Sequence, residues 1–253
     1  MINPRFGANV AGLEPSQRLL GADPLLYLDL TEGVRRGLGR IVYAEPDGAL
    51  IRFSSDDAPD GDGYAMACAG VSAAERLCAL LPQRFDFLLT LHDEFSCPVL
   101  RARYGDAFSL GVPCHQGAYL EADPLPLPAD GPKVRPLEPH HLPQAAQTYH
   151  LGSRDYLAAL IARGQLFGAF QEETMMAFIG CHDEGSMGLL EVLPPYRRRG
   201  LGQYLEAWLI NHEQRLGHIP YCQIFHDNQP SLALQRKLGL TLSPAAIRWA
   251  TPQ

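Results

Sequence analysis

Residues 121–139, "EADPLPLPADGPKVRPLEP", restrict the fold of this chain more than any other stretch. Six of these nineteen residues are prolines. Proline fixes φ and lacks a backbone donor, so the segment cannot continue a helix or an inner strand. We therefore expect an extended linker, which divides the chain into an N-terminal α/β domain over residues 1–125 and a second domain over residues 126–253.

The charge of the chain is unevenly distributed along the sequence. The net charge is −7, which argues against a general nucleic-acid binder. Residues 1–131 contain eight more acidic than basic side chains, whereas residues 132–253 contain one more basic than acidic. Three consecutive arginines stand at positions 197–199. A local positive spot on an acidic protein predicts a small anionic ligand.

The apolar runs and the cysteines indicate the cellular compartment in which we expect the protein. The start "MINPRFGANV" lacks the basic and apolar stretches of a secretion signal, and no uninterrupted apolar segment approaches 18 residues. The six cysteines are widely spaced, which is typical of reduced and mostly buried thiols. We expect a cytoplasmic protein that binds neither a membrane nor nucleic acid; the oligomeric state stays open.

No pattern in the sequence has the spacing of a metal site. The acidic turn "PDGDG" at residues 59–63 is too short for the spaced oxygen ligands of a calcium loop. The pair Cys114–His115 has no third partner at a recognisable distance along the chain. We therefore expect no metal.

Hydrophobic periodicity predicts alternating helices and strands on both sides of the linker. In the first part we expect helices over 23–37 and 72–81, a hairpin of strands 39–45 and 48–54, and a strand over 84–91. In the second part we expect helices over 140–150, 153–164, 201–217 and 228–239, a hairpin of strands 165–171 and 174–182, and strands over 186–194, 220–226 and 245–250.

The pentapeptide RRGLG occurs twice, at residues 35–39 and 198–202. The first copy lies between an expected helix and a strand, so Gly37 and Gly39 are interpreted as glycines that end the helix. Its two arginines then lie favourably at the negative end of the helix dipole.

The second copy follows a strand and two prolines and precedes a long amphipathic helix. The backbone N–H groups of residues 198–203 then have no intrahelical acceptor and attract phosphate oxygens. Gly200 and Gly202 allow the backbone to approach an anion closely. The second copy is therefore the candidate anion site.

Two blocks of the second part follow recognisable patterns. The pattern V-x-P-x-[YF]-R-x-x-G-x-G is matched by Val192, Pro194, Tyr196, Arg197, Gly200 and Gly202. The pattern N-x-x-[AS]-x-x-L-Y-x-K-x-G-F is matched in "NQPSLALQRKLGL" by Asn228, Ser231, Leu234, Lys237, Gly239 and Leu240. The first block resembles the acyl-CoA pyrophosphate loop, and the second a signature, of the GNAT N-acyltransferase superfamily. The resemblance covers residues 132–253 and is closest to the glycine N-acyltransferase-like branch. That branch carries a degenerate GNAT-like N-terminal half, which residues 1–125 are then expected to form.

The resemblance implies a GNAT fold, a mixed and mostly antiparallel sheet flanked by helices. It implies transfer of an acyl group, with acetyl-CoA as the expected donor, to a small-molecule amine or amino acid that attacks the thioester directly. The residues implied in binding acyl-CoA are Val192, Leu193, Arg197, Arg198, Arg199, Gly200, Leu201, Gly202, Gln203, Asn228 and Ser231.

The catalytic residues are less clearly marked. The position of the family's usual basic Glu falls on Ser186, which cannot act as a base alone. Glu184 and His182 share its face by strand alternation, whereas Glu191 has the opposite parity unless a bulge re-aims it. The candidates are Glu184, Ser186 and Glu191.

The proton source is also altered, because Gln235 stands where the family often has Tyr. Tyr221, His226 or solvent are the alternatives. The missing Glu and Tyr leave a second hypothesis open, a catalytically impaired acyl-CoA-binding regulatory protein.

Overall fold

The computed structural model describes residues 2–54 and 62–253. Residues 59–61 of the turn expected at 59–63 lie outside this part of the chain. The elements before the proline-rich segment, which we call the first half, are α1 (Gln17–Leu20), α2 (Leu28–Arg35), β1 (Gly39–Glu45), β2 (Gly48–Phe53), β3 (Gly63–Cys68), α3 (Val71–Leu80), β4 (Leu88–Leu91), α4 (Ser96–Tyr104), β5 (Phe108–Leu110) and β6 (Cys114–Ala118).

The first half agrees with the sequence expectation in its hairpin and in α3. The strand expected over 84–91 is shorter, because only its last four residues pair. Gly37, with φ of +73°, ends the short helix α2 as expected, but Gly39 does not: it is the first residue of β1. The strands β3, β5 and β6 and the helices α1 and α4 were not expected.

The elements of the second half are β7 (Lys133–Pro136), α5 (Leu142–Thr148), α6 (Arg154–Ala162), β8 (Leu166–Gln171), β9 (Thr174–Cys181), β10 (Met187–Val192), α7 (Leu201–Arg215), β11 (Tyr221–Phe225), α8 (Gln229–Lys237) and β12 (Thr241–Pro252). From α5 onward their order is the expected one. Ser153 caps α6 by accepting a hydrogen bond from the Tyr156 N–H at 3.0 Å, and Asn228 caps α8 by accepting one from the Ser231 N–H at 3.2 Å.

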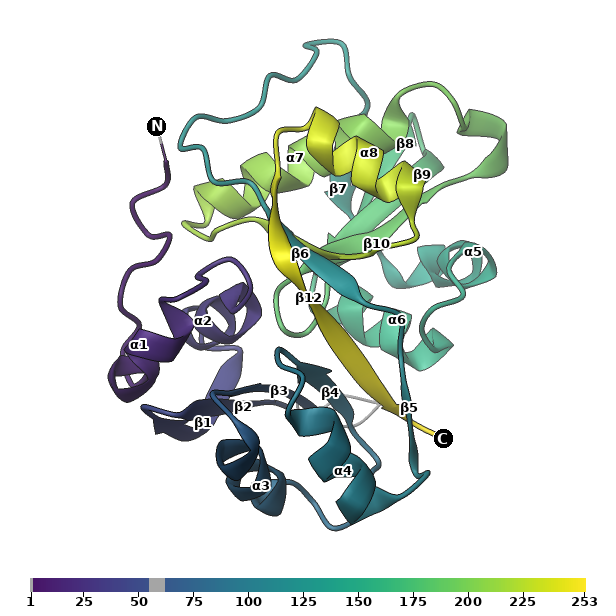
Figure 1. Cartoon of the computed structure of the whole chain (residues 1–253). Helices are drawn as coiled ribbons and strands as arrows, with labels where there is room; N and C mark the ends of the chain where they lie inside the picture. Colours follow the sequence, from purple (N-terminus) through teal and green to yellow (C-terminus); the bar gives the residue numbers. More distant parts are fainter. Residues whose placement is uncertain (1, 55–61) are drawn as a thin grey trace.

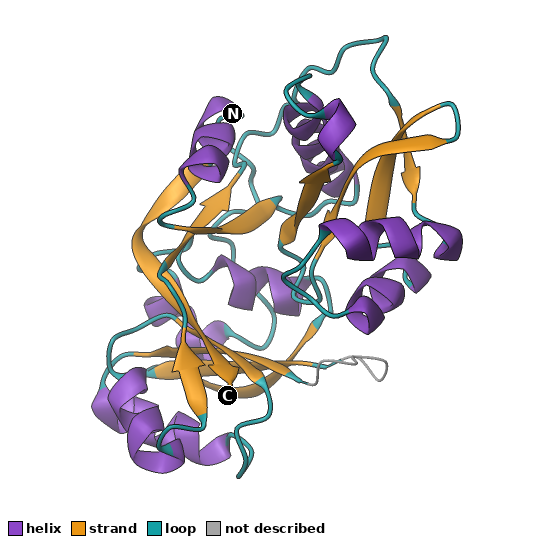
Figure 2. Cartoon of the chain, turned by 90° about the vertical axis from the view of Figure 1, so that its right-hand side faces the viewer, coloured by secondary structure: helices purple, strands orange, loops and turns teal. Residues whose placement is uncertain are grey.

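The described strands form one sheet in the order β1-β2-β3-β4-β12-β6-β11-β10-β9-β8-β7, with β5 beside β12. Only two neighbouring pairs on this path are parallel, β3 with β4 and β10 with β11. In Figure 1 the long yellow strand β12 runs from the second half, at the top, down to the first half. Figure 2 shows the curved sheet with helices on both of its faces.

Strand pairing crosses the boundary expected at residues 125/126. β6 precedes the proline-rich segment, yet it lies between β11 and β12 of the second half. β12 in turn pairs with β4 and β5 of the first half. The division into domains stays a prediction, and the two halves share one sheet. β7 ends at Pro136 and directly follows Pro132, and it is an edge strand, where a missing backbone donor is tolerated.

The same order of elements occurs twice. β1-β2-β3-α3-β4-α4-β5 in the first half corresponds to β8-β9-β10-α7-β11-α8-β12 in the second, and two helices precede each series. The pairing agrees as well, because two antiparallel pairs and then a parallel pair follow one another in both halves.

The sheet of the second half buries apolar side chains on both faces. On one face α7 and α8 pack against β9, β10 and β11 through a cluster that includes Leu205, Leu209 and Leu232. On the other face α5 and α6 pack through a cluster that includes Leu157, Leu160 and Phe178. We call these the α7–α8 face and the α5–α6 face.

Three further observations concern the whole described chain. All six cysteines are free thiols, and five of them are buried. Within residues 2–54 and 62–253, no helix combines the length and the apolar character needed to cross a bilayer. The same residues contain no group of three or more His, Cys, Asp or Glu side chains that could hold a metal ion.

Candidate functional site

The parallel strands β10 and β11 separate almost at once. They pair at one position, Met187 with Cys222. The corresponding strands of the first half, β3 and β4, pair at four consecutive positions. The backbones of these two strands in the second half therefore diverge from a vertex at Met187 and Cys222, whereas those of the first half stay paired; we call the space between the diverging strands the opening.

A β-bulge lies in β10 next to this opening. Gly188 pairs with Gly180 and Glu191 with Phe178, so two residues of β10 face one residue of β9. Leu189 has φ of +54°, in the left-handed region that β-branched and bulky residues rarely adopt. The bulge reverses the parity of the strand beyond it.

The bulge decides which side chains share a face. Leu189 belongs to the cluster on the α5–α6 face, and Leu190 packs against the cluster on the α7–α8 face. Glu191 then lies on the α5–α6 face, where burial raises the pKa of Tyr149 and the negative charges of Glu191 and Glu184 raise it further. The sequence left this point open, and the structure brings Glu184 and Glu191 to one face.

The end of β10 offers one backbone donor to the opening. The Leu193 N–H donates to the Met176 carbonyl oxygen of β9 at 2.9 Å and is therefore occupied. Because N–H groups alternate in direction along a strand, the Val192 N–H points away from β9, toward β11. Of the two residues expected here, Val192 presents the available donor. The Arg197 Nε donates to the Val192 carbonyl oxygen at 2.9 Å.

The second RRGLG copy forms the turn into α7. Gly200 is the N-cap, with φ of +80°, and Arg198 has φ of +63°. The Tyr204 N–H donates to the Gly200 carbonyl oxygen at 3.0 Å. Among the described residues, no acceptor faces the N–H groups of residues 198–203. Orphan donors at the positive end of a helix dipole form an anion site.

Arg197, Arg198 and Arg199 are exposed at this turn. None of them forms an ion pair with a carboxylate in the part of the chain that the structure describes. The Arg199 guanidinium lies 5.6 Å from the centre of the Tyr196 ring. The turn therefore carries positive charge that an anionic ligand can use.

Gly202 lies where α7 passes the open end of β10. A Cβ atom at this position would lie 3.7 Å from Val192 Cγ2 and 3.8 Å from Leu190 Cδ2, which is ordinary contact distance. Leu201 is buried beside it, and Gln203 is half-buried. The first turn of α7 thus borders the opening between the strands.

The N-terminus of α8 lies at the same edge of the sheet. β10 and β11 are parallel, so the helices that follow their ends begin at one edge. Asn228 and Ser231, which the resemblance implicates in binding, are placed there with the side chain of Asn228 engaged as the helix cap. The expected binding residues from both blocks therefore border one end of the opening.

Glu184 and Ser186 lie directly before β10. The Ser186 hydroxyl donates to Glu184 Oε1 at 2.5 Å, and Ser186 is buried. The Tyr221 hydroxyl donates to the Glu184 carbonyl oxygen at 2.7 Å. Burial raises the pKa of Glu184, while the charge of His182 and the Ser186 hydroxyl lower it. The carboxyl is thus poised to take up a proton more readily than an exposed one.

His182 and Glu191 complete the polar groups on the α5–α6 face. His182 Nδ1 lies 2.8 Å from the Tyr156 hydroxyl, and its ring covers the Cα of Gly188, where a Cβ would meet Nε2 at 2.5 Å. Burial raises the pKa of Glu191, and the charges of Arg197 and His150 lower it.

The side chains considered as proton sources, and Gln235 at the family's Tyr position, differ in their exposure to solvent. Tyr221 is fully buried, its ring lies against the Arg36 guanidinium, and burial raises its pKa well above the ordinary value. His226 is exposed at the end of β11. Gln235, at the position of the family's Tyr, is 3% exposed and faces Glu206 of α7.

Glu206 is a residue that the sequence analysis missed. It is 3% exposed, and burial raises its pKa to about 7, while a hydrogen bond from the Gln235 side chain lowers it. Its position could have been noticed, because Leu205, Leu209 and Ile210 surround it on the apolar stripe of α7. A carboxyl within such a stripe is unusual unless it has a partner or a role.

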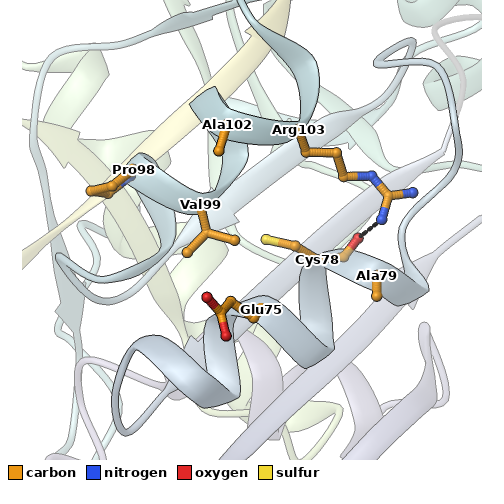
Figure 3. A pocket seen from close by; sticks show the side chains of 7 residues that line it. All are labelled: Glu75, Cys78, Ala79, Pro98, Val99, Ala102 and Arg103. Carbon is orange, nitrogen blue, oxygen red and sulfur yellow. Dashed lines mark hydrogen bonds between the residues drawn. The ribbon is translucent and has the colours of Figure 1, made fainter.

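A pocket of about 440 Å³ lies in the first half, between α3 and α4. Figure 3 shows its lining side chains, Glu75, Cys78, Ala79, Pro98, Val99, Ala102 and Arg103. The Arg103 guanidinium donates to the Cys78 carbonyl oxygen at 2.6 Å. α3 and α4 lie at the opposite end of the molecule from α7 and α8 in Figure 1, so this pocket is separate from the opening between β10 and β11.

Part of this chain is similar in sequence to a known protein family. Residues 166–250, about a third of the chain, match the family described as FR47-like protein. No curated protein matches the sequence.

Solved structures share the architecture over nearly the whole chain. A Drosophila protein is 18% identical, with a TM-score of 0.67 over 95% of this chain and 94% of its own. A GNAT-family protein from Novosphingobium aromaticivorans is 20% identical, with a TM-score of 0.57 over 91% of this chain and 97% of its own. A GCN5-related N-acetyltransferase from Kribbella flavida is 14% identical, with a TM-score of 0.58 over 90% and 95%. The chain thus has the GNAT fold, and within it residues 166–250 are similar to the GNAT-related FR47-like family.

Proposed function

We propose that this protein is an acyl-CoA-dependent N-acyltransferase that uses acetyl-CoA and acylates a small-molecule amine or amino acid. The observation that carries the proposal is the opening between β10 and β11, which ends at the unpaired N–H groups of residues 198–203. A thioester with a long polar arm and a pyrophosphate fits a gap between strands that leads to an anion site. The similarity to GNAT structures supports this assignment at the level of the fold.

The pyrophosphate would lie at the N-terminus of α7. There the N–H groups of residues 198–203 would donate to its oxygens, and Arg197, Arg198 and Arg199 would add positive charge. Gly200, Leu201, Gly202 and Gln203 would line the approach. Asn228 and Ser231 would border the arm of the cofactor from α8.

The chemistry proposed is direct attack of the amine on the thioester carbonyl. The Val192 N–H would stabilise the oxyanion, because it points into the opening and a fixed donor stabilises developing charge. The amine would enter from the α5–α6 face, where Glu184 and Glu191 lie. We assign Glu184 as the base, because its carboxyl bonds Ser186 beside the vertex residue Met187 and no arginine lowers its pKa.

The first half is, in this proposal, a degenerate copy of the same fold that binds no acyl-CoA. The order of elements and the strand pairing repeat. However, β3 and β4 stay paired at four positions, so no opening exists between them. The turn before α3 consists of Ala69 and Gly70 and contains no arginine. The glycine N-acyltransferase-like branch is the member of the superfamily that this arrangement resembles.

The test is release of free thiol from acetyl-CoA with a pool of small amines and amino acids, alongside calorimetric binding of CoA. Binding with amine-dependent thiol release supports the proposal. Tight binding without thiol release for any amine supports the acyl-CoA-binding regulatory protein instead. Failure to bind any CoA thioester contradicts both.

A further inference from the structure

We propose that Glu206 of α7 gives its proton to the thiolate of the departing CoA, and that Gln235 of α8 holds the Glu206 carboxyl in place for this step. This inference rests on the proposed function and adds a proton donor to it. It concerns the α7–α8 face of the opening, whereas the base candidates lie on the α5–α6 face.

The position of Glu206 on α7 follows from helix geometry. Gly202 lies against Leu190 and Val192 at the open end of β10. Glu206 follows one turn later, on the same side of the helix. There it faces Cys222 of β11, whose pKa is raised by burial and, to a smaller extent, by the Glu206 charge. Cys222 pairs with Met187 at the vertex of the opening. α7 therefore leads from the anion site to a carboxyl near the vertex.

Glu206 and Gln235 are both buried polar side chains, and one oxygen of the pair lacks a hydrogen-bond partner. Glu206 and Gln235 are each 3% exposed. Gln235 Oε1 has no hydrogen-bond partner among the described residues, although the side chain of Gln235 bonds Glu206. An unpaired buried carbonyl oxygen destabilises the folded protein, so a ligand group that donates a hydrogen bond to it would be favoured at this site. A thiol or amide group of a bound ligand can supply the missing donor.

The surroundings of Glu206 allow it to titrate near neutral pH. The titratable group that faces it from β11 is the Cys222 thiol, which burial keeps protonated by raising its pKa. On β9 and β10, Cys181 faces Glu213 instead, and Glu191 lies on the opposite face of the sheet.

On α8, Gln235 is uncharged, and Arg236 and Lys237 are exposed. Burial thus acts on the Glu206 pKa without an opposing cation and raises it to about 7.

The proposed step transfers protons between the acceptor amine, the base, Glu206, the leaving sulfur and solvent. The ammonium form of the acceptor loses one proton to the base, and its nitrogen attacks the thioester carbonyl carbon. The nitrogen loses a second proton to solvent as the C–S bond breaks and the sulfur takes the electron pair. Glu206 transfers its proton to that sulfur, which gives CoA thiol, and regains a proton from solvent. One proton is released overall for each amide formed.

Two properties, measured in the wild type, Glu206→Gln and Gln235→Leu, test the role of Glu206 as proton donor. The first is the pH dependence of kcat, which reports groups of the enzyme–substrate complex. In the wild type, kcat should fall above about pH 7. In Glu206→Gln, we expect kcat to fall at least tenfold below pH 7 and this descending limb to disappear. In Gln235→Leu the limb should move to higher pH, because a bond that lowers the pKa of Glu206 is lost.

The second property is the pKa of the thiol of bound CoA, which is measured through the ultraviolet absorbance of its thiolate. A nearby carboxylate disfavours the thiolate, so Glu206→Gln should lower this pKa. Glu213→Gln is the matched control, since it removes another buried carboxyl of α7, which pairs with Arg36 and His218 instead. It should leave the descending limb and the thiol pKa where they are in the wild type.

An unchanged limb together with an unchanged thiol pKa in Glu206→Gln would overturn the inference and leave the proposed function standing. Absence of CoA binding in the wild type would overturn the proposed function itself, and the inference with it.

Discussion

Arg36 of α2 and Glu213 of α7 form a buried ion pair, with Nη1 and Oε2 3.0 Å apart. Their side chains are 4% and 6% exposed. Arg36 also bonds Glu32, and it donates to the carbonyl oxygens of Gly185 and Ile219 at 2.9 and 2.6 Å. The second arginine of the first RRGLG copy therefore joins the first half to the turn before β10 and to the entry of β11.

We expect Arg36→Ala to lower the free energy of unfolding by about 3–5 kcal/mol, because it removes the buried cation that Glu32 and Glu213 share and leaves them only the less buried Arg35 and His218. Urea unfolding measures the change. The matched control is Arg199→Ala, the same letter of the second copy, which is exposed. It should change stability by less than about 0.5 kcal/mol and weaken CoA binding a fewfold. Equal stability losses in both variants would contradict this assignment.

The glycines at the third position of the two RRGLG copies form a second matched pair of sites. Gly37 and Gly200 have φ of +73° and +80°, and a Cβ at either would meet no atom within 4 Å. Alanine at each site should therefore cost a similar strain, about 1–2 kcal/mol. Only Gly200→Ala should weaken CoA binding, at least tenfold, because it alters the turn that presents the N–H groups. Calorimetry on both variants checks this, and equal affinities would show that the turn does not hold the pyrophosphate.

Glu206→Gln should stabilise the protein at neutral and higher pH. The wild-type folded state holds a proton on Glu206 up to about pH 7, whereas the unfolded chain releases it near pH 4.5. The contribution of Glu206 to the free energy of unfolding, relative to the variant, is therefore fully present below about pH 4.5 and is lost as pH rises to about 7. The loss amounts to about 3 kcal/mol. Unfolding curves at acidic and alkaline pH measure it; a pH-independent difference would contradict the raised pKa.

Glu184→Gln should lower kcat/KM about a hundredfold or more if Glu184 is the base. Glu191→Gln, on the same face, is the comparison and should lower it less than tenfold. Ser186→Ala removes a hydrogen bond that lowers the pKa of Glu184, so the ascending limb of the pH profile should move to higher pH. A larger effect of Glu191→Gln would transfer the role of base to that residue.

Many elements could be predicted from local sequence. Hydrophobic periodicity located the hairpin of β8 and β9, the helices α6 and α7, and the strand β10, because each has a clear period and its own caps or turn residues. The strands β3 and β6 were missed. β6 has the sequence "CHQGA", with little apolar character, and it is a strand only because β11 and β12 pair with it on both sides.

The candidate site was predicted in its loop and left open in its catalytic groups. The sequence of residues 197–202 specifies the anion turn, since the glycines and the following helix are local features. The common face of Glu184 and Glu191 depends on the bulge at Leu189, which forms against β9. The contact of Glu206 with Gln235 depends on the packing of α7 against α8. Neither the shared face nor the contact can be predicted from spacing along the chain.

The two copies of RRGLG separate these contributions. The sequence by itself determined that the first copy ends a helix and the second begins one, because the order of strand, turn and helix around each copy is local. Only the tertiary structure decided that Arg36 is buried between the halves and Arg199 exposed at an anion site. The reason is physical: burial of an arginine requires carboxylates and carbonyls that distant segments bring to it, and identical letters in different surroundings meet different partners.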